Sequence, residues 1–178
     1  EVTRDLHANG PVGVMTDYEA KFHDQGLPIC RCVGTMVPWE EPFPTDIRRV
    51  KNRWLDVFAD GVPDADLGKH VLSEGSYLWH LFSWELVPCL SGDAARQALA
   101  AAPGEKYLFY YEYPPEGEPL VRPVTAEELA ALPTDAGAIP GADWYLVDKD
   151  FTWTYVQTHE ADCGPYFCRR DPSLSVSG

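Results

Sequence analysis

The sequence predicts an α+β fold, in which a single domain has a mixed or mainly antiparallel sheet with helices packed on it. First, the 178 residues are 45% hydrophobic and 12% aromatic, which is enough to build one buried core. Second, helix-like and strand-like segments alternate through most of the chain and then give way to a run of strands. Third, that final run has the pattern of a C-terminal three-strand antiparallel meander.

Residues 1–26 have weak periodicity, and a candidate strand and then a clear helix follow them. Thr16 and Glu19 have the spacing of a capping box, and residues 27–37 are strand-like. After a proline-broken loop, Thr45 is the expected N-cap of the clearest helix in the chain. The apolar residues of this helix recur at helical spacing, at Ile47, Val50, Trp54, Val57 and Phe58.

Two elements are expected in the middle of the chain. Residues 77–84, YLWHLFSW, form an apolar run too short for periodicity to separate strand from helix. Their aromatic content favours a strand. Ser91 is the expected N-cap of an alanine-rich helix over residues 92–102.

A strand, a connector and a short helix come next. Residues 106–112, KYLFYYE, are strand-like, and the proline-rich residues 114–123 are expected to connect them to the next element. Thr125 and Glu128 form a capping box, which predicts a helix over residues 126–132.

The meander is expected over the aromatic stretch that follows. Its strands are predicted at residues 144–147, 151–160 and 166–168, with a turn at 148–150. Because strand side chains alternate between faces, one face of the second strand carries Phe151, Trp153, Tyr155, Gln157 and His159. The other face carries Thr152, Thr154, Val156, Thr158 and Glu160. The second face is threonine-rich, as is typical of a half-exposed sheet.

Composition also predicts the domain boundaries. Residues 1–44 are expected to form an N-terminal arm or extension, and residues 45–170 a single α+β domain. Residues 171–178 are expected to be a disordered tail.

Charge narrows the class of partner. With 28 acidic and 14 basic residues, the net charge is −14, so binding to nucleic acid or to an anionic membrane is not expected. Such a charge suits a basic protein partner, or it simply keeps the protein soluble. No apolar run approaches the roughly 20 residues of a membrane helix, and no signal-peptide pattern is seen. Five cysteines without a regular framework fit reduced thiols, and a cytoplasmic location is therefore expected.

Nucleophilic chemistry is the first hypothesis for the polar end of the meander. Cys163 follows His159 by four residues, and a turn could return the thiol to the imidazole. The candidates to orient that base are Asp148, Asp150, Glu160 and Asp162. A small hydrolase or transferase would use His159, Glu160 and Cys163 as catalytic residues, with His80 facing them.

Metal binding is the second hypothesis. Ligand types suited to zinc occur at His80, His159, Glu160 and Cys163. A four-thiolate site would use Cys30, Cys32, Cys163 and Cys168. These cysteine spacings match those of paired zinc ligands poorly. No metal ligand and no cofactor is therefore predicted, and zinc is kept as the alternative.

Two other interpretations of the same corner stay open. Glu160 and Asp162 lie close together, and a like-charged pair raises one pKa into a range useful for acid–base catalysis. Alternatively, His159, Glu160 and the Gly164–Pro165 turn only stabilise the meander.

Several residue strings occur in order from Trp54 onward. They are YLWHLFS at 77–83, DKDF at 148–151, WTYV at 153–156, THE at 158–160 and GPYF at 164–167. In these strings the chain resembles an uncharacterised bacterial family, the domain of unknown function 4275. The resemblance marks His80, His159 and Glu160 as motif members, and it implies no established activity. It also marks Trp79, Trp153, Pro165 and Tyr166, for which a structural role is the alternative.

Together these observations favour an acidic protein-binding module, of the kind represented by immunity-like inhibitors of a basic toxin or nuclease. Exposed aromatic anchors would supply the affinity, and the acidic field would steer association. The expected binding residues are Trp79, Trp153, Tyr155, Tyr166, Asp148 and Asp150. The alternative is the small hydrolase or transferase. A DNA mimic is less well supported, because the acidic residues are scattered.

Overall fold

The computed structural model describes residues 43–110, 114–132 and 142–170. Its helices are α2 (Ile47–Phe58), α3 (Asp64–His70), α4 (His80–Ser83), α5 (Gly92–Ala101) and α6 (Ala126–Ala131). Its strands are β1 (Leu90–Ser91), β2 (Lys106–Tyr110), β3 (Val121–Val124), β4 (Trp144–Asp148), β5 (Trp153–Gln157) and β6 (Tyr166–Arg169). None of the helices in these ranges has both the length and the apolar character needed to cross a membrane.

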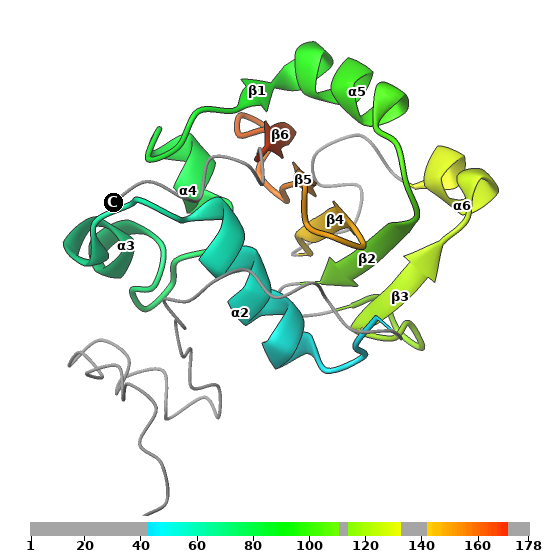
Figure 1. The fold of residues 1–178 in the computed structure, drawn as a ribbon, viewed down its shortest axis with the longest axis horizontal. Coiled ribbons are helices and arrows are strands. Elements are labelled where there is room, and N and C mark those ends of the chain that lie inside the picture. The colour runs from blue at the N-terminus through cyan, green and yellow to red at the C-terminus, as the bar shows by residue number, and fades with distance from the viewer. Residues whose placement is uncertain (1–42, 111–113, 133–141, 171–178) are drawn as a thin grey trace, which may run out of the picture.

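The strands form one six-stranded sheet in the order β1-β6-β5-β4-β2-β3. Every neighbouring pair in this sheet is antiparallel. Helices α2, α3 and α4 lie to one side of the sheet, and α5 and α6 lie to the other (Figure 1). The predicted α+β fold is therefore confirmed, and β4, β5 and β6 form the predicted C-terminal meander.

Buried side chains form two clusters, one on each face of the sheet. In β4, Tyr145 and Val147 face the cluster under α2, α3 and α4. Trp144 and Leu146 face the cluster under α5 and α6. The strand thus alternates between two apolar environments, which explains why its sequence is a continuous hydrophobic run.

Helix α2 begins one residue later than the sequence predicted. Asp46, and not Thr45, is the N-cap, because its carboxylate accepts the backbone N–H of Arg48 at 2.9 Å. The predicted apolar stripe is correct, since Val50, Trp54 and the last two residues of the helix are buried. This stripe packs α2 onto the sheet.

A hydrogen bond between buried side chains joins α2 to the centre of the sheet. The indole Nε1–H of Trp54 donates to Thr154 Oγ1 at 2.9 Å, and both residues are fully buried. The Thr154 hydroxyl in turn donates to the carbonyl of Leu146 at 3.0 Å. Two polar groups that burial removes from water are therefore satisfied internally.

The C-terminal end of α2 is joined to the end of β6. Arg170 Nη2 donates to the carbonyl oxygens of Phe58 at 2.8 Å and Asp60 at 3.0 Å. A guanidinium at this position also complements the negative end of the helix dipole. The first helix and the last strand of the described domain are thereby held together.

The prediction of a strand over residues 77–84 is wrong. Backbone N–H groups in this segment bond to carbonyls three or four residues earlier, as in His80 to Tyr77 at 3.0 Å and Ser83 to Trp79 at 3.2 Å. Residues 80–83 form the single helical turn α4, and they bury Leu81 and Phe82. Local hydrogen bonds satisfy the backbone, whereas the aromatic content had favoured a strand.

The half-exposed face predicted for β5 is also wrong, because every residue of β5 is buried. Thr154 and Val156 lie under the α2 side, and Trp153 and Tyr155 lie under the α5 side. Phe151 does not share a face with Trp153, since it has a positive φ of 56° in the turn and packs in the α2-side cluster.

The tight turn between β4 and β5 is organised by Asp148. Its carboxylate accepts the backbone N–H and the hydroxyl of Thr152, each at 2.6 Å, and the backbone N–H of Trp153 at 3.2 Å. The carboxylate of Asp148 is thus satisfied by hydrogen bonds within the turn, as is common for aspartate, and it can be buried there.

The remaining predictions have mixed outcomes. The capping box of Thr125 and Glu128 is present at the start of α6. Ser91 occupies the N-cap position of α5, although its side chain makes no capping bond. The predicted connector over residues 114–123 contains the beginning of strand β3, an edge strand in which Pro123 is tolerated.

Predictions for the first part of the chain fall largely outside the described residues. The capping box at Thr16 and the strand over 27–37 are among them, and the predicted tail over 171–178 also lies outside the described residues. Phe43, at the end of the predicted arm, is described and is buried. Its ring stacks on Tyr107 at 3.8 Å and on Phe151 at 5.8 Å between centroids. The core therefore includes residues at least as early as Phe43.

The Trp54–Thr154 contact predicts a measurable coupling. Thr154→Val leaves the Trp54 indole N–H and one carbonyl bond unsatisfied, so we expect the free energy of unfolding to fall by about 1–3 kcal/mol. Urea denaturation followed by circular dichroism measures it. In a double-mutant cycle with Trp54→Phe, the double variant should be less destabilised than the sum of the singles. Strict additivity would contradict the contact.

Candidate functional site

The strongest candidate site lies at one end of the two central strands, where β4 begins and β5 ends. Asp143 directly precedes β4, and only 4% of its surface is exposed. One carboxylate oxygen accepts the backbone N–H of His159 at 2.8 Å and lies 2.8 Å from His159 Nδ1. The other accepts the indole Nε1–H of Trp79 at 2.9 Å. This buried carboxylate is therefore surrounded by donors from two distant segments of the chain.

His159 is oriented by Asp143. Its Nδ1 satisfies the carboxylate when that nitrogen carries the proton, and in the neutral form of this tautomer Nε2 has a free lone pair. The imidazole side chain is 22% exposed, and Nε2 lies 4.0 Å from a carboxylate oxygen of Glu160. An aspartate that fixes the tautomer of a partly exposed histidine is an arrangement suited to general-base chemistry.

Aromatic rings form the wall of this corner. Tyr77 and Trp79 are stacked with centroids 5.8 Å apart, and His159 meets the edge or face of Tyr77 at 5.0 Å. His80 contacts the Trp79 ring at 4.3 Å. The backbone N–H of Trp79 donates to the hydroxyl of Tyr145 at 3.2 Å. The turn before α4 thus brings the predicted His80 and His159 to the same aromatic wall.

His80 is held as a neutral imidazole. Burial lowers its pKa, and Glu160 and Asp143 oppose this effect only in part. Its Nδ1 lies 3.1 Å from the carbonyl oxygen of His70, to which it donates when protonated, and 3.3 Å from the backbone nitrogen of Tyr77, whose N–H it accepts in the other tautomer. These contacts fix the ring between α3 and the site.

Cys163 lacks the features of an activated nucleophile. Burial raises the pKa of its thiol, and a hydrogen bond and negative charge from Glu160 raise it further. Within the described residues, the structure gives Cys163 no hydrogen bond to His159. The Thr158 hydroxyl bonds to the carbonyls of Glu160 and Cys163 and closes the turn. These contacts favour a structural role for the turn.

Of the four predicted orienting acids, Glu160 comes within 4.0 Å of His159, at Nε2 and not at Nδ1, and the other three do not orient the ring. Asp148 caps its own turn, and Asp150 and Asp162 are exposed. The partner is Asp143, which sequence reasoning missed. Its only signal was a carboxylate directly before a buried strand, and the fold alone shows that this position lies beside the end of β5.

Metal ligands do not converge in the described part of the chain. In that part no three His, Cys, Asp or Glu side chains are grouped so that they could hold a metal ion. The four-thiolate alternative includes Cys30 and Cys32, which lie outside the described residues. Cys89, Cys163 and Cys168 are free thiols.

The expectation that the predicted aromatic anchors are exposed is wrong. Trp79, Trp153, Tyr155 and Tyr166 are all buried. Large hydrophobic side chains are instead exposed at Trp84 (57%), Leu90 (46%) and Leu120 (36%), again among the described residues. The exposure of Trp84 was not predicted, because residues 77–84 were assigned as a whole to a buried strand.

Asp143 should be essential to this corner. In Asp143→Asn, the amide that replaces one oxygen would oppose the indole N–H of Trp79, donor against donor. We expect the free energy of unfolding to fall by about 1–3 kcal/mol in urea denaturation. ¹⁵N NMR should find His159 protonated at Nδ1 in the wild type, with this preference reduced in the variant.

Asp150→Asn is the matched control, because it makes the same change at an exposed carboxylate. We expect it to stay within about 0.5 kcal/mol of the wild type. Equal stability of the two variants would contradict the role assigned to Asp143.

His80 predicts a pH dependence. Its pKa in the folded state lies below the ordinary value of 6.5, so between these two values the unfolded chain binds more protons. The contribution of neutral His80 to stability is therefore complete above pH 6.5 and is lost as pH falls toward the folded pKa. Urea denaturation across this range should give a shallower pH dependence for His80→Gln than for the wild type. Identical slopes would contradict the assignment.

Comparison with known proteins places the chain in a family. A family model described as "Domain of unknown function (DUF4275)" matches residues 44–167. No curated protein matches the chain, and no solved structure does. The matched region runs from the loop before α2 into β6, and it contains Asp143, His159, Trp79 and His80. Because the match covers more than half of the sequence, the chain belongs to the DUF4275 family.

Proposed function

We propose that the chain is an acidic protein-binding module that associates with a basic protein through a surface centred on Trp84. The observation that carries the proposal is the 57% exposure of Trp84. The described tryptophans Trp54, Trp79, Trp144 and Trp153 are buried. An exposed tryptophan is costly in water and is among the residues most often found at the energetic centre of an interface.

Trp84 is held by contacts with α3 and α4. It follows α4, and its backbone N–H donates to the carbonyl of His80 at 3.1 Å. Its ring lies 4.6 Å from the ring of His70, at the end of α3. The neighbouring Leu81 and Phe82 are buried in the core. A side chain fixed in this way loses little conformational freedom when it is buried by a partner.

We call the part of the molecule formed by α3, α4 and Trp84 the Trp84 surface. The charges of residues 60–85, which include these elements, favour a basic partner. Residues 60–85 contain one lysine and five carboxylates, at Asp60, Asp64, Asp66, Glu74 and Glu85. Basic residues gather instead on α2, at Arg48, Arg49, Lys51 and Arg53. A basic protein would be attracted toward α3 and α4 and repelled from the beginning of α2, which orients the encounter.

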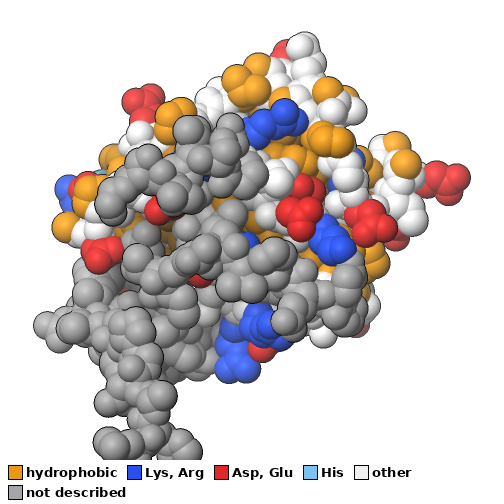
Figure 2. All heavy atoms as spheres, in the orientation of Figure 1, with side chains coloured by type: hydrophobic (Ala, Val, Ile, Leu, Met, Phe, Trp, Pro, Cys, Tyr) orange, Lys and Arg blue, Asp and Glu red, His pale blue; other side chains and the backbone are white. Residues whose placement is uncertain are grey.

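On one face of the molecule, the acidic side chains of the described residues do not form phosphate-like rows. On the face drawn in Figure 2, they are dispersed among basic and hydrophobic side chains. This distribution supports a protein partner recognised through one aromatic anchor, and not a DNA mimic. An immunity-like inhibitor of a basic toxin or nuclease, acting in the cytoplasm, is the specific form of the proposal. The free thiols at Cys89, Cys163 and Cys168 suit that compartment.

Binding by three immobilised proteins tests the proposal. Wild type, Trp84→Ala and Leu120→Ala are challenged with extract of the source cells at low salt, and a retained basic protein is purified and its affinity measured. Leu120 is the control, because it is an exposed hydrophobic residue in another part of the fold. We expect Trp84→Ala to weaken binding about 30-fold or more and Leu120→Ala to have little effect.

Rising salt should weaken the association further, because the attraction is between exposed charges. Retention of no basic protein, or equal affinity of the wild type and Trp84→Ala, would contradict the proposal.

A second candidate is favoured by the Asp143–His159 pair. A small hydrolase or transferase would use His159 Nε2 as the base, with Asp143 holding the imidazole. The raised pKa of Cys163 disfavours it as the nucleophile, so the base would activate water or a substrate hydroxyl. Saturable hydrolysis of p-nitrophenyl acetate or p-nitrophenyl phosphate, abolished in His159→Gln and kept in Glu127→Gln, would support it. Equal rates in both variants would exclude this role of His159.

A further inference from the structure

A pocket lies at another part of the sheet, where the edge strand β1 begins. Its volume is about 490 Å³, within the range usual for small-molecule sites. The lining residues are Pro88, Cys89, Leu90, Ala98, Ala101, Phe167 and Arg169. This set is apolar except for one thiol and one guanidinium.

The pocket exists because β1 is short. β1 pairs with β6 only at Leu90↔Phe167 and Ser91↔Tyr166. Pro88 has no backbone N–H, so the strand cannot continue this ladder along β6. The edge of β6 beyond Phe167 is consequently left without a neighbouring strand in the described part of the chain. Helix α5 adds only the methyl groups of Ala98 and Ala101, which leave space above the sheet.

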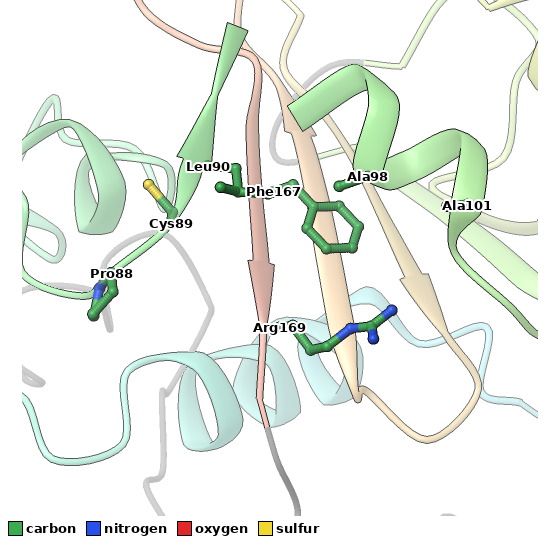
Figure 3. Close-up of a pocket in the computed structure, with 7 residues that line it drawn as sticks. All are labelled: Pro88, Cys89, Leu90, Ala98, Ala101, Phe167 and Arg169. Carbon is green, nitrogen blue, oxygen red and sulfur yellow. The ribbon is translucent and has the colours of Figure 1, made fainter. Parts of the chain in front are cut away.

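Two side chains of β6 define the chemistry of this space. Phe167 and Arg169 are two residues apart and extend from β6 to the side on which α5 lies (Figure 3). Phe167 is buried and supplies an apolar floor, whereas Arg169 is exposed. Among the described residues, no hydrogen bond or ion pair engages the Arg169 side chain. A cation without a carboxylate partner is notable in a chain with a net charge of −14.

We propose that this pocket binds a small monocarboxylic acid with an apolar body, whose carboxylate pairs with Arg169. A guanidinium matches a carboxylate with two parallel hydrogen bonds, and Phe167, Leu90 and the α5 alanines bury the hydrocarbon part. With a single cation in the lining, a second negative charge on the ligand would have no partner. Burial raises the pKa of the Cys89 thiol, so Cys89 does not compete as an anion. The pocket shares no lining residue with the Trp84 surface.

Phenylacetate is the probe, with phenylacetamide as its neutral counterpart. Amide signals of the full chain are followed by ¹H–¹⁵N NMR during titration. We expect phenylacetate to shift the signals of Ala98, Ala101, Phe167 and Arg169, and phenylacetamide to bind about tenfold more weakly or worse. Arg169→Gln should produce a similar loss for phenylacetate. Arg48→Gln should not, although it also removes an exposed guanidinium, from α2.

Ala98→Leu provides a second variant, because its larger side chain fills the pocket and leaves the cation in place. It should also abolish the shifts. The proposal is overturned if phenylacetate produces no shifts at these residues, if the amide binds as tightly as the acid, or if Arg169→Gln binds phenylacetate like the wild type. None of these results depends on the partner proposed for Trp84, so the two proposals can fail separately.

Discussion

The burial of both faces of the sheet is the constraint from which most of the structure follows. Every residue of β4 and β5 is buried, so a polar group along these strands is costly unless it finds an internal partner. Thr154 meets the indole of Trp54, Asp148 binds its own turn, and Asp143 gathers Trp79 and His159. The candidate site is therefore one of the places where the sheet must satisfy a buried polar group, and its histidine is oriented as a consequence.

Local signals in the sequence predicted the parts of the fold that local chemistry decides. The capping box of α6, the apolar stripe of α2 and the strands of the meander depend on neighbours in the chain, and these predictions were confirmed. Residues 77–84 were misassigned because their aromatic side chains fit a helical turn in a core as well as a strand. Strand β3 was missed because its proline is tolerated only at an edge, and edges are decided by strand order.

The candidate site was predictable in its histidines and not in its carboxylate. His80 and His159 stood out by residue type, and both lie at the aromatic wall of Tyr77 and Trp79. Asp143 lies 16 positions from His159, and only the register of β4 against β5 brings them together. The solvent exposure of a side chain could not be predicted from its sequence neighbours either. Trp79 and Trp84 are five residues apart in one segment, yet Trp79 is buried and Trp84 is exposed. Sequence patterns identified the candidate histidines, whereas the packing of distant segments determines which side chains are accessible.

Pairing between β1 and β6 also has a consequence for how the chain is made. β1 is complete by residue 91, yet its partner spans Tyr166–Arg169, and Arg170 then bonds to the end of α2, 112 positions earlier. During synthesis from the N-terminus, α2 and the two-stranded unit of β2 and β3 emerge long before the strands that cover them. The aromatic side chains of α2 and α4 therefore stay exposed to solvent until the last strands are synthesised. We expect the domain to complete its folding late and cooperatively.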